Sequence, residues 1–123
     1  MIINNVTSTG FNKIMKNASR DDVFEYIQQN IDSIMTQLNK ESKVKLPFEL
    51  NNQTVKGLGL EIENLTDTIK SLRLVATNNN QEAKKMIVKG SESEIINAVK
   101  EPKFKEILKT GTESLEYYLN LGK

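Results

Sequence analysis

A single stretch, residues 19–39, most constrains how this chain can fold. Its apolar side chains recur at steps of four, four, three and four residues, at Val23, Ile27, Ile31, Ile34 and Leu38. That spacing places one continuous stripe on an α-helix. Ser19 followed by Asp22 is an approximate capping box at its start. The sequence therefore predicts a long amphipathic N-terminal helix, roughly 30 Å in length, whose stripe must be covered by the rest of the chain.

The remaining 102 positions are predicted to form one domain with that helix, residues 1–123, because no low-complexity linker or repeat interrupts the chain. Cysteine and histidine are both absent. Disulfides, thiolate or imidazole catalysis and Cys- or His-based metal sites are thereby excluded. The net charge is +1 and is spread evenly, so nucleic acid is an improbable partner. No apolar run is long enough to span a membrane and no signal-peptide pattern opens the chain, which favours the cytoplasm while leaving signal-less export open.

The middle of the chain shows the alternation of half-buried strands. Residues 44–50, 54–63 and 69–77 each place apolar side chains at every second position, and Pro47 marks the first as an edge strand. These segments predict a small antiparallel meander. An alternative remains, because Leu58, Ile62, Leu65, Ile69, Leu72 and Ala76 also follow a heptad pattern that one long helix would satisfy. The glycines at 57 and 59 favour strands.

The last third carries helix signals. We expect short helices over 80–90, 91–101, 102–111 and 112–121, with Gly90 at a left-handed C-terminal position, Gly111 ending the third helix, and Ser91 with Glu94 as a capping box. The first of these would hold Ala83, Met86 and Ile87. The predicted fold class is α+β: a long N-terminal helix, an antiparallel meander and a C-terminal cluster of short helices, with an all-α fold as the alternative.

No group of residues has the arrangement of a catalytic site. Glu61 with Glu63, and Glu92 with Glu94, could serve as paired carboxylates, but solvent-facing charges explain them better. The lysines between 84 and 109 alternate with glutamates and indicate a mixed-charge surface, with weak nucleic-acid binding as an alternative. We therefore expect no enzymatic activity, no cofactor and no metal.

Protein binding is the predicted function. The large apolar residues of the C-terminal helices exceed what a small domain can easily bury, and the candidate partner-binding residues are Phe104, Leu108, Tyr117 and Tyr118. Phe104 and Leu108 could instead close the core. Adjacent helical residues point about 100° apart, so at least one tyrosine should be exposed. The expected partner is another protein, with a homodimer as a further possibility.

Residues 57–87, GLGLEIENLTDTIKSLRLVATNNNQEAKKMI, resemble the C-terminal domain of flagellar hook-length control proteins. Leu60 and Ile62 would match its first strand, residues 72–76 its second strand, and residues 83–87 its helix. The resemblance implies an export-linked regulator whose folded domain meets the export gate. A phage- or plasmid-type inhibitor or immunity protein is the other specific alternative, since such proteins are also short and free of catalytic residues.

Overall fold

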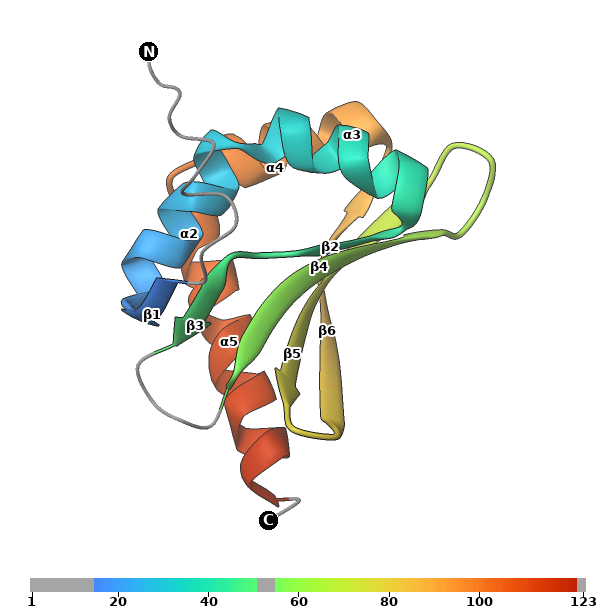
Figure 1. Ribbon diagram of the computed structural model, residues 1–123. Coiled ribbons are helices and arrows are strands. Elements are labelled where there is room, and N and C mark those ends of the chain that lie inside the picture. The colour runs from blue at the N-terminus through green and yellow to red at the C-terminus, as the bar shows by residue number, and fades with distance from the viewer. Residues whose placement is uncertain (1–14, 51–54, 122–123) are drawn as a thin grey trace.

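The computed structural model describes residues 15–50 and 55–121. The elements follow in the order β1 (Met15–Ala18), α2 (Arg20–Gln29), α3 (Ile31–Glu41), β2 (Lys43–Lys45), β3 (Phe48–Leu50), β4 (Gly57–Asn64), β5 (Lys70–Asn78), β6 (Gln81–Gly90), α4 (Glu92–Lys100) and α5 (Phe104–Leu121). The fold is α+β (Figure 1). The all-α alternative is wrong, because the central segments pair as strands.

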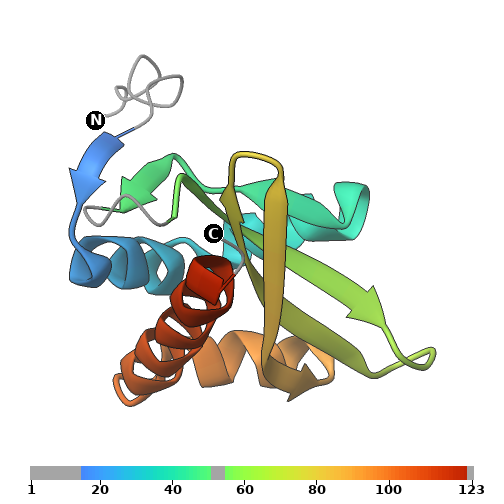
Figure 2. The ribbon, with the colours of Figure 1, turned by 90° about the horizontal axis from the view of Figure 1, so that it is seen from below.

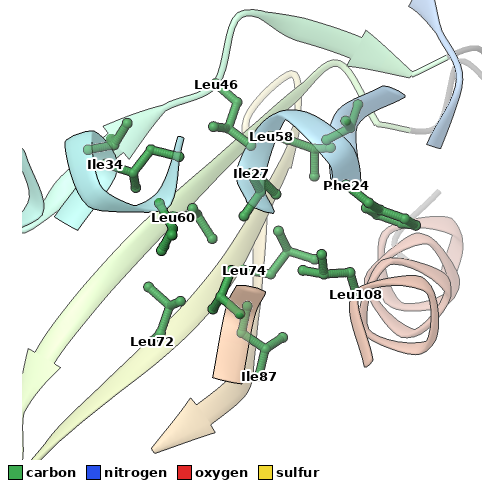
Figure 3. Close-up of a cluster of buried hydrophobic side chains, with 14 of the residues drawn as sticks. Phe24, Ile27, Ile34, Leu46, Leu58, Leu60, Leu72, Leu74, Ile87 and Leu108 are labelled. Carbon is green, nitrogen blue, oxygen red and sulfur yellow. The ribbon is translucent and has the colours of Figure 1, made fainter. Parts of the chain in front are cut away.

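A four-stranded antiparallel sheet in the order β2-β4-β5-β6 forms one layer. The helices pack against its inner face, and Figure 2 shows α5 beside the β5–β6 hairpin. The core lies between the two layers. Figure 3 shows it: Ile27 and Ile34 from the helices face Leu60, Leu72 and Leu74 from the sheet.

The predicted meander is confirmed as β2, β4 and β5, with direct pairs such as Leu60↔Leu74. Pro47 lies between β2 and β3, where no strand hydrogen bond is needed from it. Beyond Pro47 the chain leaves the main sheet, and β3 pairs in parallel with β1. The predicted single strand over 44–50 is therefore two short strands in different sheets.

The prediction of one long helix over 19–39 is wrong in one respect, because the helix ends at Asn30 and a second begins at Ile31. The Asn30 side chain donates a hydrogen bond to the Tyr26 carbonyl (2.9 Å), and the Asn30 backbone N–H donates to the same oxygen. Asn30 takes φ −115° and ψ 16°, outside the helical region. The apolar stripe continues across this break, and Ile27, Ile31 and Ile34 are buried as predicted.

The helix predicted over 80–90 is wrong, because residues 81–90 form a strand, β6. Asn79 and Asn80 form the turn of a hairpin, and Asn79 adopts φ 58°, which asparagine tolerates well. Residues 81–90 then pair with β5 along their length. The helix that the flagellar resemblance requires at 83–87 is thus absent, while both of its strands are present.

The C-terminal cluster contains two helices in place of the four predicted. The Ser91–Glu94 capping box is confirmed at the start of α4. Gly111 and Thr112 do not separate two helices; α5 runs through both. The Thr112 hydroxyl donates to the Leu108 carbonyl (2.8 Å), so it is satisfied inside the helix and does not cap a new one.

Candidate partner-binding surface

The four predicted partner-binding residues divide into two pairs. Phe104 and Leu108 are 2 % and 0 % exposed and belong to the core, as Figure 3 shows for Leu108. A partner cannot reach them, because their face of α5 packs on α2 and the sheet. Tyr117 and Tyr118 are 63 % and 62 % exposed. Their rings stack edge to face with centroids 6.3 Å apart.

Two further exposed apolar side chains lie on α5 itself and on the adjoining strand β6. Ile107 of α5 is 44 % exposed, and Met86 of the adjoining strand β6 is 50 % exposed. The sequence pattern did not indicate either as a surface residue. Met86 was expected in a helix with Ala83 and Ile87, and Ile107 in a helix ending at Gly111, separate from that of the tyrosines. We call this region the α5–β6 surface and define it as Met86, Ile107, Thr110, Ser114, Tyr117 and Tyr118.

The α5–β6 surface contains two shallow hollows. One, of about 280 Å³, lies between β6 and α5 and is lined by Lys85, Met86, Ile87, Glu106, Ile107, Thr110 and Gly111. The other, of about 320 Å³, is lined by Thr110, Glu113, Ser114, Tyr117 and Tyr118. Thr110 lines both, so the two hollows are neighbours along one side of α5.

A separate ionic cluster occupies the outer face of the sheet. Glu61, only 8 % exposed, accepts hydrogen bonds from Lys84 Nζ (2.9 and 3.2 Å) and lies 3.5 Å from Lys43 Nζ and 3.7 Å from Arg73 Nη1. Burial by itself would raise the pKa of Glu61, but the hydrogen bonds and charges of Lys84 and Lys43 outweigh it and hold the pKa below its ordinary value. Glu63 in turn binds Arg73. The two carboxylates of the Glu61–Glu63 pair are thus engaged by the protein's own cations.

A third hollow, of about 370 Å³, opens on the same outer face and is lined by residues of β2, β4 and β5, including Lys43, Lys45, Gly57, Gly59 and Thr77. Its two glycines have a structural explanation. A Cβ on Gly59 would lie 2.8 Å from the Val44 carbonyl oxygen, and one on Gly57 would lie 3.0 Å from the Thr77 hydroxyl. Gly59 therefore permits the close approach of β2 to β4, and Gly57 leaves room for the Thr77 side chain of β5.

Several lysines considered for nucleic-acid binding are engaged in ion pairs. Lys84 binds Glu61, Lys100 lies 3.1 Å from Asp32, and Lys103 lies 3.3 Å from Glu101. Within the described part of the chain, no three His, Cys, Asp or Glu residues are grouped so that they could hold a metal ion. No helix among the described residues is long and apolar enough to cross a membrane.

Comparison of the chain with protein-family models, with curated proteins and with solved structures finds no match.

Proposed function

We propose that this protein is a small, non-enzymatic binding or regulatory protein that recognises another protein through the α5–β6 surface. One observation carries the proposal. Among the described residues, the large apolar side chains that are exposed are Leu65, Met86, Ile107, Tyr117 and Tyr118, and all except Leu65 belong to this surface. Apolar side chains gathered on one face, with polar groups around them, are typical of protein-binding sites.

The composition of the surface supports the same proposal. Two tyrosines and a methionine are residue types enriched at protein interfaces, where the tyrosine hydroxyl can stay in water while the ring is covered. Their anchoring element is rigid, because the opposite face of α5 is held in the core through Leu115 and Leu119. A partner would therefore meet a surface that is already formed.

The first experiment replaces Tyr118 by the photo-crosslinker p-benzoylphenylalanine in the full chain, in cells of the native host. Leu65 offers a matched control position, because it is similarly exposed at 45 % but lies in the loop between β4 and β5. We expect a discrete protein adduct from position 118 and none of the same mass from position 65. Adducts of equal yield at both positions would contradict the proposal.

The second experiment measures the affinity of the purified, crosslinked partner for point variants. Tyr118→Ala should weaken binding about fivefold or more, equivalent to roughly 1 kcal/mol, while leaving the melting temperature nearly unchanged. Leu65→Ala should bind as the wild type does. A Tyr118→Ala variant that binds normally would place the interface elsewhere.

A further inference from the structure

Helix α5 carries a second stripe on the side away from the core. Ile107, Thr110, Ser114 and Tyr117 follow at steps of three, four and three residues, which is the spacing of a seam between two packed helices. The buried stripe consists of Phe104, Leu108, Leu115 and Leu119. The second stripe lies outside this buried stripe; its Ile107 end borders β6 across the first hollow, and Tyr117 is exposed.

The shape of this stripe suits a helical occupant. Its ends are large, Ile107 and Tyr117, and its middle residues are small, Thr110 and Ser114. Small residues let a second backbone approach closely, and the two hollows beside Thr110 leave room for side chains of that second helix. Ile107 and Ser114, one from each hollow, are seven residues apart, which is about 10 Å along the helix axis.

The charges along the stripe indicate what charge a helix bound to it would carry. Glu106 lines one hollow and Glu113 the other, again seven residues apart. Glu106 has no ion pair among the described residues, and Glu113 has only a 3.7 Å contact with Arg20. Lys85 is the one cation lining either hollow. The α5 side of the stripe is therefore net negative and favours a basic partner.

We propose that the seam on α5 binds an amphipathic helix of the partner protein, with two large apolar side chains seven residues apart and with lysine or arginine opposite Glu106 and Glu113. This inference rests on the proposed function and specifies its partner.

Two other arrangements on this surface are disfavoured, an antiparallel pair of α5 helices and an added strand. A second copy packing its α5 antiparallel on the first would set the flank bearing Glu106 and Glu113 against the same flank of its partner, because the two-fold axis keeps equivalent flanks on one side. An added strand would have to pair with the free edge of β6. That edge carries Lys84, Lys85 and Lys89, and the pairing register of β6 with β5 shifts between Leu72 and Arg73. Lysines and bulges are the usual means by which edge strands avoid pairing.

The test uses a displayed library of 18-residue helical peptides. Seam positions vary between alanine and large apolar residues, and flanking positions vary between lysine and glutamate. Selection on the wild-type protein should enrich large apolar residues at i and i+7 together with lysine on one flank. Selection on the double variant Glu106→Lys/Glu113→Lys should enrich glutamate on that flank, because the reversed charges attract the opposite sign. Glu25→Lys/Glu41→Lys, which reverses two exposed charges on α2 and α3, should select the same peptides as the wild type.

A steric variant completes the test with an individual selected peptide. Ser114→Gln should weaken its binding at least tenfold by filling the seam, whereas Ser33→Gln on α3 should not change it. Enrichment that is insensitive to the Glu106/Glu113 reversal, or no enrichment of helical peptides, would overturn the inference. A wild-type dimer would also overturn the inference, if sedimentation at about 100 µM detects it and Ser114→Gln dissociates it. The occupant of the seam would then be a second copy. Crosslinking from position 118 would in each case still report on the proposed function by itself.

Discussion

Glu61 is the residue at which the charges of the outer sheet face converge. Its cationic partners come from three strands, Lys43 from β2, Arg73 from β5 and Lys84 from β6. Removing a carboxylate from water costs free energy unless such partners compensate it. The lowered pKa of Glu61 indicates that its charged form is favoured in the folded state over the neutral form. The cluster thus links the edge strands to the central pair.

Glu61→Gln should lower the free energy of unfolding by about 1–2 kcal/mol at pH 7, because the three cations lose their common partner. A carboxyl group with a lowered pKa stabilises the folded state at pH values above its pKa in the unfolded chain, which is about 4.3. This stabilisation is lost as the pH falls through the pKa in the folded state. The difference between wild type and variant should therefore shrink below about pH 4. Urea unfolding at pH 7 and pH 3 measures both effects.

The control for Glu61 is Glu63→Gln. Glu63 pairs with the same Arg73, but its side chain is 47 % exposed, so the loss should stay within about 1 kcal/mol. An equal effect of Glu61→Gln at both pH values would show that its role is steric.

Ile31 tests the packing of the helical layer on the sheet. It is the first residue of α3, directly after the break at Asn30, and it is fully buried. Ile31→Ala should cost about 2–4 kcal/mol through lost apolar contacts and the remaining cavity. Thermal or denaturant unfolding checks this, and a loss below about 1 kcal/mol would mean that the stripe is exposed in solution.

At the scale of elements, helix α5 depends on a glycine in its middle. Gly111 is buried against the sheet, and a Cβ there would lie 3.4 Å from Ile87 Cγ2 and 3.7 Å from Leu74 Cδ2. The small residue therefore brings the helix close to β5 and β6. This close approach explains why α5 continues where the sequence suggested an end.

Gly111→Ala should raise the free energy of unfolding by about 0.5–1 kcal/mol, because alanine has the better helix propensity and its methyl group makes only ordinary contacts. Gly111→Leu should instead destabilise by about 1–3 kcal/mol through overpacking. Chemical denaturation of both variants measures the difference. If Gly111 instead ended a helix in the left-handed conformation, alanine would be destabilising, so a loss of stability in Gly111→Ala would contradict a continuous α5.

At the scale of the whole molecule, the described helices pack on one face of the sheet, and α5 also carries the exposed side chains of Ile107, Tyr117 and Tyr118. The α5–β6 surface exists only because β6 is the strand beside α5. With the predicted helix over 80–90, Met86 would lie elsewhere. The secondary structure of this one segment therefore decides whether Met86 belongs to the proposed binding surface.

Solution measurements can establish the secondary structure of residues 81–90. We expect Cα chemical shifts typical of a strand over residues 81–90 and a far-ultraviolet circular dichroism spectrum with helix over roughly two fifths of the chain. Helical shifts at residues 83–87 would remove Met86 from the proposed surface. A helix content of roughly three quarters would restore the all-α alternative, because an α+β fold does not reach so high a content.

The features that could be predicted from the sequence are those whose causes lie within a few residues. The capping box of Ser91 with Glu94, the buried stripe at Ile27 and Ile31, and the alternation of β4 and β5 all follow from local spacing. The exposure of a tyrosine followed in the same way, because adjacent helical residues cannot face one core.

The secondary structure around residues 83–87 and Gly111 depends instead on tertiary contacts. Residues 83–87 match a helical pattern, but the exposed backbone of β5 offers hydrogen bonds along nine register positions, and these make the segment a strand. Glycine is common at helix ends, but Gly111 packs close to Ile87 and Leu74 and lies inside α5. Both outcomes depend on residues distant in sequence that meet only in the folded chain, and together they create the surface on which the proposed function depends.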